Sequence, residues 1–170
     1  MLRNFEKTRT ARCAVIEKTP LTIVLTGTLH HQMLEHALSL PRLEVCGLLG
    51  EHGGLIKSYY PVDNIAEERH RAFLMDPEGQ LRAMRIMCER GETMAGIFHS
   101  HPDTPARPSS RDLHEARYAD VYYFIASLQY STPEIKVYYF DGGRFDDVSI
   151  TMDMDNHHCQ NPGTHHTDEP

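Results

Sequence analysis

Two histidines and an aspartate lie close together in the sequence, with His99 and His101 in the run HSHP and the carboxylate at Asp112. A catalytic zinc site takes three nitrogen or oxygen ligands from the protein and keeps its fourth position for water. The two imidazoles and the carboxylate supply that set, and Glu44 lies upstream as a candidate general base. The pattern predicts a hydrolase with one Zn²⁺ ion per chain.

The elements expected around these residues bring the three side chains together. Residues 94–98 form a short apolar run that leads into His99, which is typical of a buried strand. Side chains two residues apart on a strand point to the same face, so His99 and His101 are expected to share a face. Pro102 cannot donate to a sheet ladder and should end this strand. The Pro-rich loop that follows returns the chain to a helix with Asp112 in its first turn.

Ser109 and Asp112 also allow an interpretation that needs no metal. A serine at the N-cap of a helix, followed three residues later by an acidic residue, is typical of a capping box. That pattern accounts for both residues at the start of the helix but leaves His99 and His101 unexplained. Zinc binding is therefore the favoured interpretation, and the capping role is compatible with it.

The segment EVCGLLG at residues 44–50, together with HSHP at residues 99–102, resembles the JAMM or MPN-plus metallopeptidases. The resemblance extends from about Leu21 to Ile150. It implies an α/β (α+β, cytidine-deaminase-like) fold, a single domain in which a central, mostly antiparallel mixed sheet is flanked by helices. It also implies roles for five residues: the zinc ligands would be His99, His101 and Asp112, the acid/base Glu44, and the residue that assists the oxyanion Ser109.

The same resemblance implies a substrate, because JAMM enzymes cleave after the C-terminal Gly-Gly of ubiquitin-like proteins. The spacings from Glu44 to His99 and from Asp112 to Ile150 leave no room for long insertions, so the chain is similar to the minimal prokaryotic type. The implied activity is that of a peptidase or isopeptidase whose partner is a small ubiquitin-like sulfur-carrier protein. Two other functions stay open: a catalytically silent binding module for such a protein, and a small-molecule amide hydrolase. A homodimer also stays open.

Length and composition predict a globular protein that binds neither nucleic acid nor membrane. The 170 residues are 40% hydrophobic and 24% charged, which is ordinary for a soluble domain. The net charge of −7 argues against nucleic acid as the main partner. No apolar stretch approaches the roughly 20 residues of a spanning helix. The four cysteines form no Cys-x-x-Cys pair, and the expected compartment is the reducing cytoplasm.

Three segments are expected along the chain: an N-terminal extension at residues 1–20, the JAMM domain at residues 21–150 and a His-rich tail at residues 151–170. The tail is polar and contains two His-His pairs. A segment with so few apolar residues cannot bury enough surface to fold, so the tail is expected to be disordered.

Periodicity and turn residues predict a mixture of strands and helices within the domain. A first helix is expected to follow a Thr28 N-cap and to end near Leu40. A second helix is expected to follow an Asp76 N-cap. Its predicted buried face consists of Leu81, Met84 and Cys88. Besides the histidine strand, strands are expected at residues 21–26, 43–50, 55–62, 121–128, 134–140 and 145–150.

Overall fold

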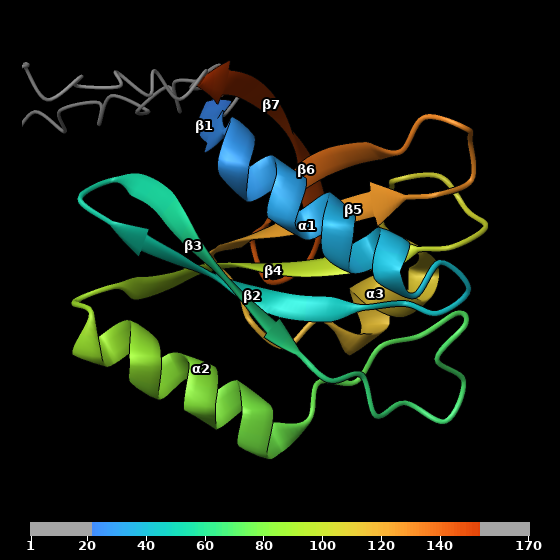
Figure 1. Ribbon diagram of the computed structural model, residues 1–170, viewed down its shortest axis with the longest axis horizontal. Coiled ribbons are helices and arrows are strands. Elements are labelled where there is room, and N and C mark those ends of the chain that lie inside the picture. The colour runs from blue at the N-terminus through green and yellow to red at the C-terminus, as the bar shows by residue number, and fades with distance from the viewer. Residues whose placement is uncertain (1–21, 154–170) are drawn as a thin grey trace, which may run out of the picture.

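The computed structural model describes residues 22–153, which form one α+β domain (Figure 1). The expected extension at residues 1–20 lies outside the described residues. Of the expected tail at residues 151–170, residues 154–170 also lie outside them, whereas residues 151–153 form the end of β7 and are not part of a disordered tail. Within the described part, no helix is both long enough and apolar enough to cross a membrane. The elements, in chain order, are β1 (Thr22–Thr26), α1 (Gly27–Ser39), β2 (Cys46–His52), β3 (Leu55–Val62), α2 (Pro77–Glu89), β4 (Thr93–His101), α3 (Ser110–Glu115), β5 (Val121–Ser127), β6 (Glu134–Phe140) and β7 (Phe145–Asp153).

The strands form a seven-stranded sheet that is mixed and mostly antiparallel, which confirms the predicted fold class. The strand order is β1-β7-β6-β5-β4-β2-β3. The pairs β1/β7 and β4/β5 are parallel, and the other neighbouring pairs are antiparallel. Because β4 lies between β5 and β2, the backbone of the histidine strand is hydrogen-bonded along both edges.

The two longer helices cover opposite faces of the sheet (Figure 1). α1 buries Leu29, Met33 and Ala37 in a cluster that includes Phe98. α2 packs into a second cluster that includes Ile97. Neighbouring side chains on a strand point to opposite faces, so the adjacent Ile97 and Phe98 assign the two clusters to the two faces of β4. The histidine strand therefore runs through the middle layer of the domain.

α1 begins earlier than the sequence predicted. Its N-cap is Thr26 rather than Thr28, and the Thr26 hydroxyl accepts a hydrogen bond from the Leu29 N–H at 3.2 Å. β1 ends at the same Thr26, so the chain passes from strand to helix without a connecting loop. The helix ends as expected near Leu40, which is its C-cap and is 48% exposed.

The predicted buried face of α2 is wrong. Leu81 is 64% exposed, Cys88 is exposed and Met84 is only partly buried. The residues that α2 buries are Ala83 and Met87. Both sets of residues recur at helical spacing, so the periodicity alone could not select between the two faces. Ala83 and Met87 pack against the sheet in the cluster that includes Ile97, and this packing determines which face is buried.

Candidate metal centre

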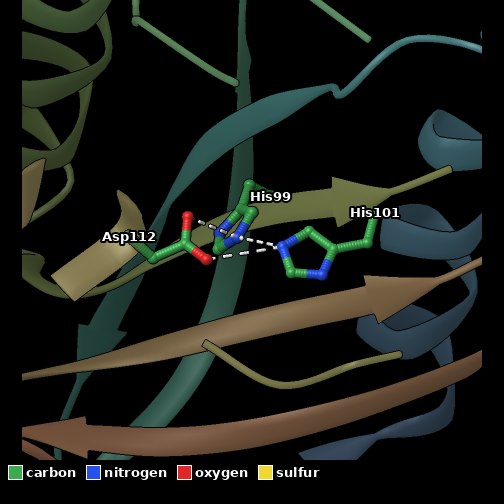
Figure 2. A group of neighbouring side chains, drawn as sticks. All are labelled: His99, His101 and Asp112. Carbon is green, nitrogen blue, oxygen red and sulfur yellow. Dashed lines mark hydrogen bonds and ion pairs between the residues drawn. The ribbon is translucent and has the colours of Figure 1, made fainter. Parts of the chain in front are cut away.

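The structure brings His99, His101 and Asp112 together at the end of β4 (Figure 2). The Nε2 atoms of His99 and His101 lie 3.1 Å apart. The Asp112 carboxylate faces both rings: Oδ1 is 3.4 Å from Nε2 of His99, and Oδ2 is 3.5 Å from Nε2 of His101. One candidate ligand atom from each residue lies within 4.8 Å of the other two. Within residues 22–153, this is the only such group of histidine, cysteine and acidic side chains.

The alternation of side chains along β4 aims the two imidazoles at one point, as the sequence predicted. Ser100 faces away from them, and its Oγ accepts a hydrogen bond from the Val45 N–H at 3.0 Å. The Ser100 N–H in turn donates to the Val45 carbonyl at 3.0 Å. His99 and His101 are 0% and 3% exposed, so the surrounding protein fixes both rings. The two bonds to Val45 also hold its neighbour Glu44 close to the histidine strand.

His101 presents Nε2 to the site in a form that can bind a metal. Its Nδ1 donates a hydrogen bond to the Pro105 carbonyl at 2.9 Å, and a neutral imidazole protonated at Nδ1 keeps the Nε2 lone pair free. Burial lowers the pKa of His101, but its hydrogen bonds with Asp112 and Pro105 outweigh burial and raise it. In His99, burial prevails over the attraction of Asp112 and lowers the pKa. Protonation of His101 at Nδ1 leaves its Nε2 free to bind a cation. The lowered pKa of His99 favours its neutral form, which can also bind a cation.

Asp112 is fixed by the first turn of α3, where the predicted capping box is confirmed. Ser109 is the N-cap: its Oγ accepts a hydrogen bond from the Asp112 N–H at 3.1 Å, and its N–H donates to Asp112 Oδ2 at 2.6 Å. Burial raises the pKa of Asp112, but the hydrogen bonds from His101 and His99 hold it well below its ordinary value. Asp112 is therefore an anion that faces two imidazoles, which is a donor set that zinc accepts.

Glu44 lies just before β2 and is 6% exposed. Its Oε2 atom has no hydrogen-bond partner among the described residues. Burial raises the pKa of Glu44 to about 7, with His101 lowering it and Asp112 raising it further. Two of these electrostatic partners, His101 and Asp112, are candidate ligands. A carboxyl with a pKa near neutrality can both accept and donate a proton.

Sequence reasoning missed three groups that support the site. The Phe73 ring stacks on the His99 imidazole, with centroids 4.5 Å apart and an angle of 22° between the planes. The Pro105 carbonyl orients His101, and the Ser100 hydroxyl anchors Val45. The only signal for Phe73 in the sequence is an aromatic residue that follows a polar stretch. A backbone carbonyl such as that of Pro105 leaves no signal, because every residue has one.

A cavity of about 510 Å³ opens beside the candidate metal centre. It reaches the site at Asp112 and at Phe73, and it lies between the segment of residues 66–75 and α3. Its floor is apolar and includes Met75, Ile97 and Tyr123. A cavity of this size can accommodate part of an extended peptide next to the reacting groups.

Comparison with known families assigns this fold and site to one class. The model described as prokaryotic homologs of the JAB domain matches residues 27–140, which include all five predicted site residues. The chain belongs to this family, and the predicted membership of the JAMM class, in its minimal prokaryotic form, is confirmed.

Individual relatives agree with this assignment. The chain is 27% identical to the desampylase of Haloferax volcanii over 70% of its own length and 85% of that protein. It is 31% identical to the CysO-cysteine peptidase of Mycobacterium tuberculosis over 65% of its own length and 77% of that protein. A solution structure of a Desulfitobacterium hafniense protein is similar with a TM-score of 0.71 and 36% identity, covering 80% of this chain and 97% of that one. The predicted enzyme class, a hydrolase of peptide or isopeptide bonds, agrees with the names of these relatives.

Proposed function

We propose that the chain is a zinc-dependent peptidase or isopeptidase that hydrolyses the amide bond after the C-terminal Gly-Gly of a small ubiquitin-like sulfur-carrier protein. The observation that carries this proposal is the convergence of His99, His101 and Asp112 beside the buried carboxyl of Glu44. Two imidazoles and one carboxylate are a ligand set of catalytic zinc sites, where three protein ligands leave a position for water or substrate. The donor set therefore fits one Zn²⁺ ion per chain.

In the proposed mechanism, His99, His101 and Asp112 would hold a zinc ion, which when bound would lower the pKa of a water molecule and polarise the scissile carbonyl. Glu44 accepts a proton as the water oxygen forms its bond to the carbonyl carbon. When the carbon–nitrogen bond breaks, Glu44 delivers this proton to the leaving amine. Because the pKa of Glu44 is about 7, one carboxyl can perform both transfers near neutral pH.

Ser109 is proposed to donate a hydrogen bond to the oxyanion that develops on the substrate. Its Oγ accepts the Asp112 N–H, and a hydroxyl that accepts one bond can still donate another. Losing one such donor costs a protease about 2.7–4 kcal/mol of transition-state stabilisation. Ser109 would therefore serve the site twice, once by capping α3 and once by contacting the substrate.

The proposed substrate is supported by the relatives and by the shape of the site. The name of the mycobacterial relative specifies a bond between CysO and cysteine, and the haloarchaeal relative is named a desampylase. A Gly-Gly tail has no Cβ atoms, so its backbone can approach the metal centre closely. The cavity beside Asp112 offers room for the adjoining residues. The free thiols of Cys46 and Cys88 suit a reducing compartment, and we place the protein in the cytoplasm.

The test of this function incubates the zinc-loaded protein with sulfur-carrier proteins that end in Gly-Gly followed by cysteine, a short extension or an isopeptide-linked protein. Mass spectrometry of the products is expected to show release of the group after the second glycine. The Glu44→Gln variant is the matched control, because it keeps the shape of the side chain and removes its proton-accepting group. It is expected to bind the carrier without cleaving it.

Two outcomes would support other functions. Equal carrier affinity in both forms with no cleavage by either would indicate a silent binding module. Turnover of a dipeptide or acyl-amino acid without a carrier protein, and no cleavage of any Gly-Gly substrate, would indicate a small-molecule amide hydrolase.

A further inference from the structure

Asn64 uses every hydrogen-bonding position of its side-chain amide. Its Nδ2 donates to the Glu44 carbonyl at 2.8 Å and to the Ala72 carbonyl at 2.9 Å. Its Oδ1 accepts from the N–H groups of Ala66 and Leu74, both at 3.0 Å. Two donors face two carbonyls and one oxygen faces two N–H groups, so the orientation of the amide is unambiguous. Through these four hydrogen bonds, the Asn64 side chain connects the backbone at Glu44 with the backbone of residues 66–74.

The first of these segments carries Glu44, which precedes the regular part of β2. The Glu44 carbonyl is held by Asn64, and its N–H donates to the Arg69 carbonyl at 2.6 Å. Both backbone groups of Glu44 are therefore bound to the segment between β3 and α2. The bonds fix the backbone from which the carboxyl projects, while its Oε2 atom has no partner among the described residues.

The second segment carries Phe73. Asn64 binds the Ala72 carbonyl and the Leu74 N–H, which are the backbone groups on either side of Phe73. The Phe73 ring stacks on His99 at 4.5 Å, and the buried Nδ1 of His99 has no hydrogen-bond partner in the described part of the chain. Metal-binding histidines are usually oriented by a hydrogen bond at the second ring nitrogen. At His99 the stacked Phe73 ring is a contact that can orient the imidazole without such a bond.

We propose that Asn64 is a positioning residue that sets the Glu44 backbone and the Phe73 ring with one amide, and through them orients the proton-transfer group and the His99 ligand. The inference rests on the proposed function in that it takes Glu44 as the acid/base and His99 as a ligand. Asn64 itself touches neither the ion nor the reacting atoms. The predicted consequence of losing Asn64 is a metal centre of altered geometry inside a domain that remains folded.

The test compares three variants of the full-length protein. Asn64→Ala removes all four bonds, whereas Asn64→Asp keeps the oxygen that accepts from both N–H groups and places a second carboxylate oxygen against the two carbonyls. Phe73→Leu keeps an apolar side chain but removes the stacked plane. The matched control is Ser58→Ala, which removes a half-buried hydrogen bond between Ser58 and Glu92 at 2.7 Å, away from the site.

The main readouts need no substrate. The visible absorption of the Co²⁺-substituted protein reports the geometry of the ligands, and competition with a chelator reports zinc affinity. Both Asn64 variants and Phe73→Leu are expected to shift the cobalt bands and to weaken zinc binding about 10- to 100-fold, as loss of groups that orient ligands does elsewhere. Ser58→Ala is expected to match the wild type. With an active substrate, the Asn64 variants should lower kcat and leave KM within about twofold, because Glu44 and His99 act in the chemical step.

A double variant tests whether Asn64 affects zinc binding through Phe73 or independently of it. If Asn64 orients His99 through Phe73, adding Phe73→Leu to Asn64→Ala should weaken zinc binding little beyond the stronger single variant. Wild-type cobalt spectra and zinc affinity in Asn64→Asp would overturn the proposal. If Asn64→Ala fails to fold, Asn64→Asp and Phe73→Leu still decide the question. A wild-type protein that cleaves no carrier would refute the proposed function alone, because the metal measurements are made without substrate.

Discussion

The buried carboxyl of Glu44 should destabilise the metal-free protein at neutral and alkaline pH. Its ordinary pKa of 4.5 is raised to about 7, chiefly by burial. Between these values the unfolded chain releases the Glu44 proton while the native state retains it. The unfolded state then binds fewer protons, so the free energy of unfolding falls as the pH rises through this window and stays low above it. Replacing Glu44 with glutamine removes this pH dependence, because an amide does not titrate.

The magnitude follows from the pKa change. At 6% exposure the carboxyl is shielded from solvent, so the shift converts to stability with little screening. The electrostatic penalty of Glu44 amounts to about 1 kcal/mol at pH 5 and about 3 kcal/mol at pH 8. The free energy of unfolding of Glu44→Gln, minus that of the wild type, should therefore increase by about 2 kcal/mol between these two pH values. Any pH-independent effect of the amide on packing cancels in this comparison.

The assay is urea denaturation of both proteins in a chelating buffer at pH 5 and pH 8. Glu89→Gln is the matched control, since this exposed residue at the end of α2 lies away from the site. This variant measures how the loss of one exposed carboxyl affects stability, and its effect is subtracted from that of Glu44→Gln. Parallel stability curves for the wild type and Glu44→Gln would refute the reasoning, because they would mean that Glu44 has the same pKa in both states.

Other substitutions test the roles of Ser109 and of the close packing around Gly47. Ser109→Ala should lower the free energy of unfolding by about 1 kcal/mol through loss of the cap, and should lower kcat about 10²- to 10³-fold through loss of the oxyanion donor. An unchanged kcat in this variant would mean that Ser109 only caps α3 and does not contact the oxyanion. Gly47→Ala would place a Cβ 2.5 Å from both Tyr59 Cε2 and the Tyr60 carbonyl oxygen, so we expect a loss of about 1–3 kcal/mol or more in urea denaturation. Gly27→Ala, at the first residue of α1 where nothing lies within 4 Å, should raise stability by up to about 1 kcal/mol, because alanine restricts the unfolded chain.

The candidate metal centre could be predicted because its residues follow local rules. His99 and His101 share a face through the two-residue repeat of a strand, and Ser109 and Asp112 follow the pattern of a helix N-terminus. The only further requirement was that the loop between this strand and this helix bring Asp112 back to the two histidines. The beginning of β3 at Leu55 and its end were likewise predicted, since a glycine turn sets its start.

The parts that were not predicted depend on contacts between distant segments. The buried face of α2 was wrong because Leu81 and Ala83 both fit a helical repeat, and only packing against the sheet distinguishes them. Asn64 and Phe73 lie far from His99 in the sequence. Nothing local in the polar segment indicates that Phe73 stacks on His99 or that Asn64 binds the backbone of Glu44. Groups that orient catalytic residues from distant parts of the chain can therefore be identified only in the folded structure.

The measurement that tests the account most directly is the metal content of the protein after dialysis against trace Zn²⁺. Elemental analysis should find one zinc ion per chain in the wild type. His101→Ala should retain none, and Glu44→Gln should retain one, because Glu44 is assigned to proton transfer and not to metal binding. A wild-type protein that retains no ion, or a His101→Ala variant that retains as much as the wild type, would contradict the central claim that His99, His101 and Asp112 form the metal centre.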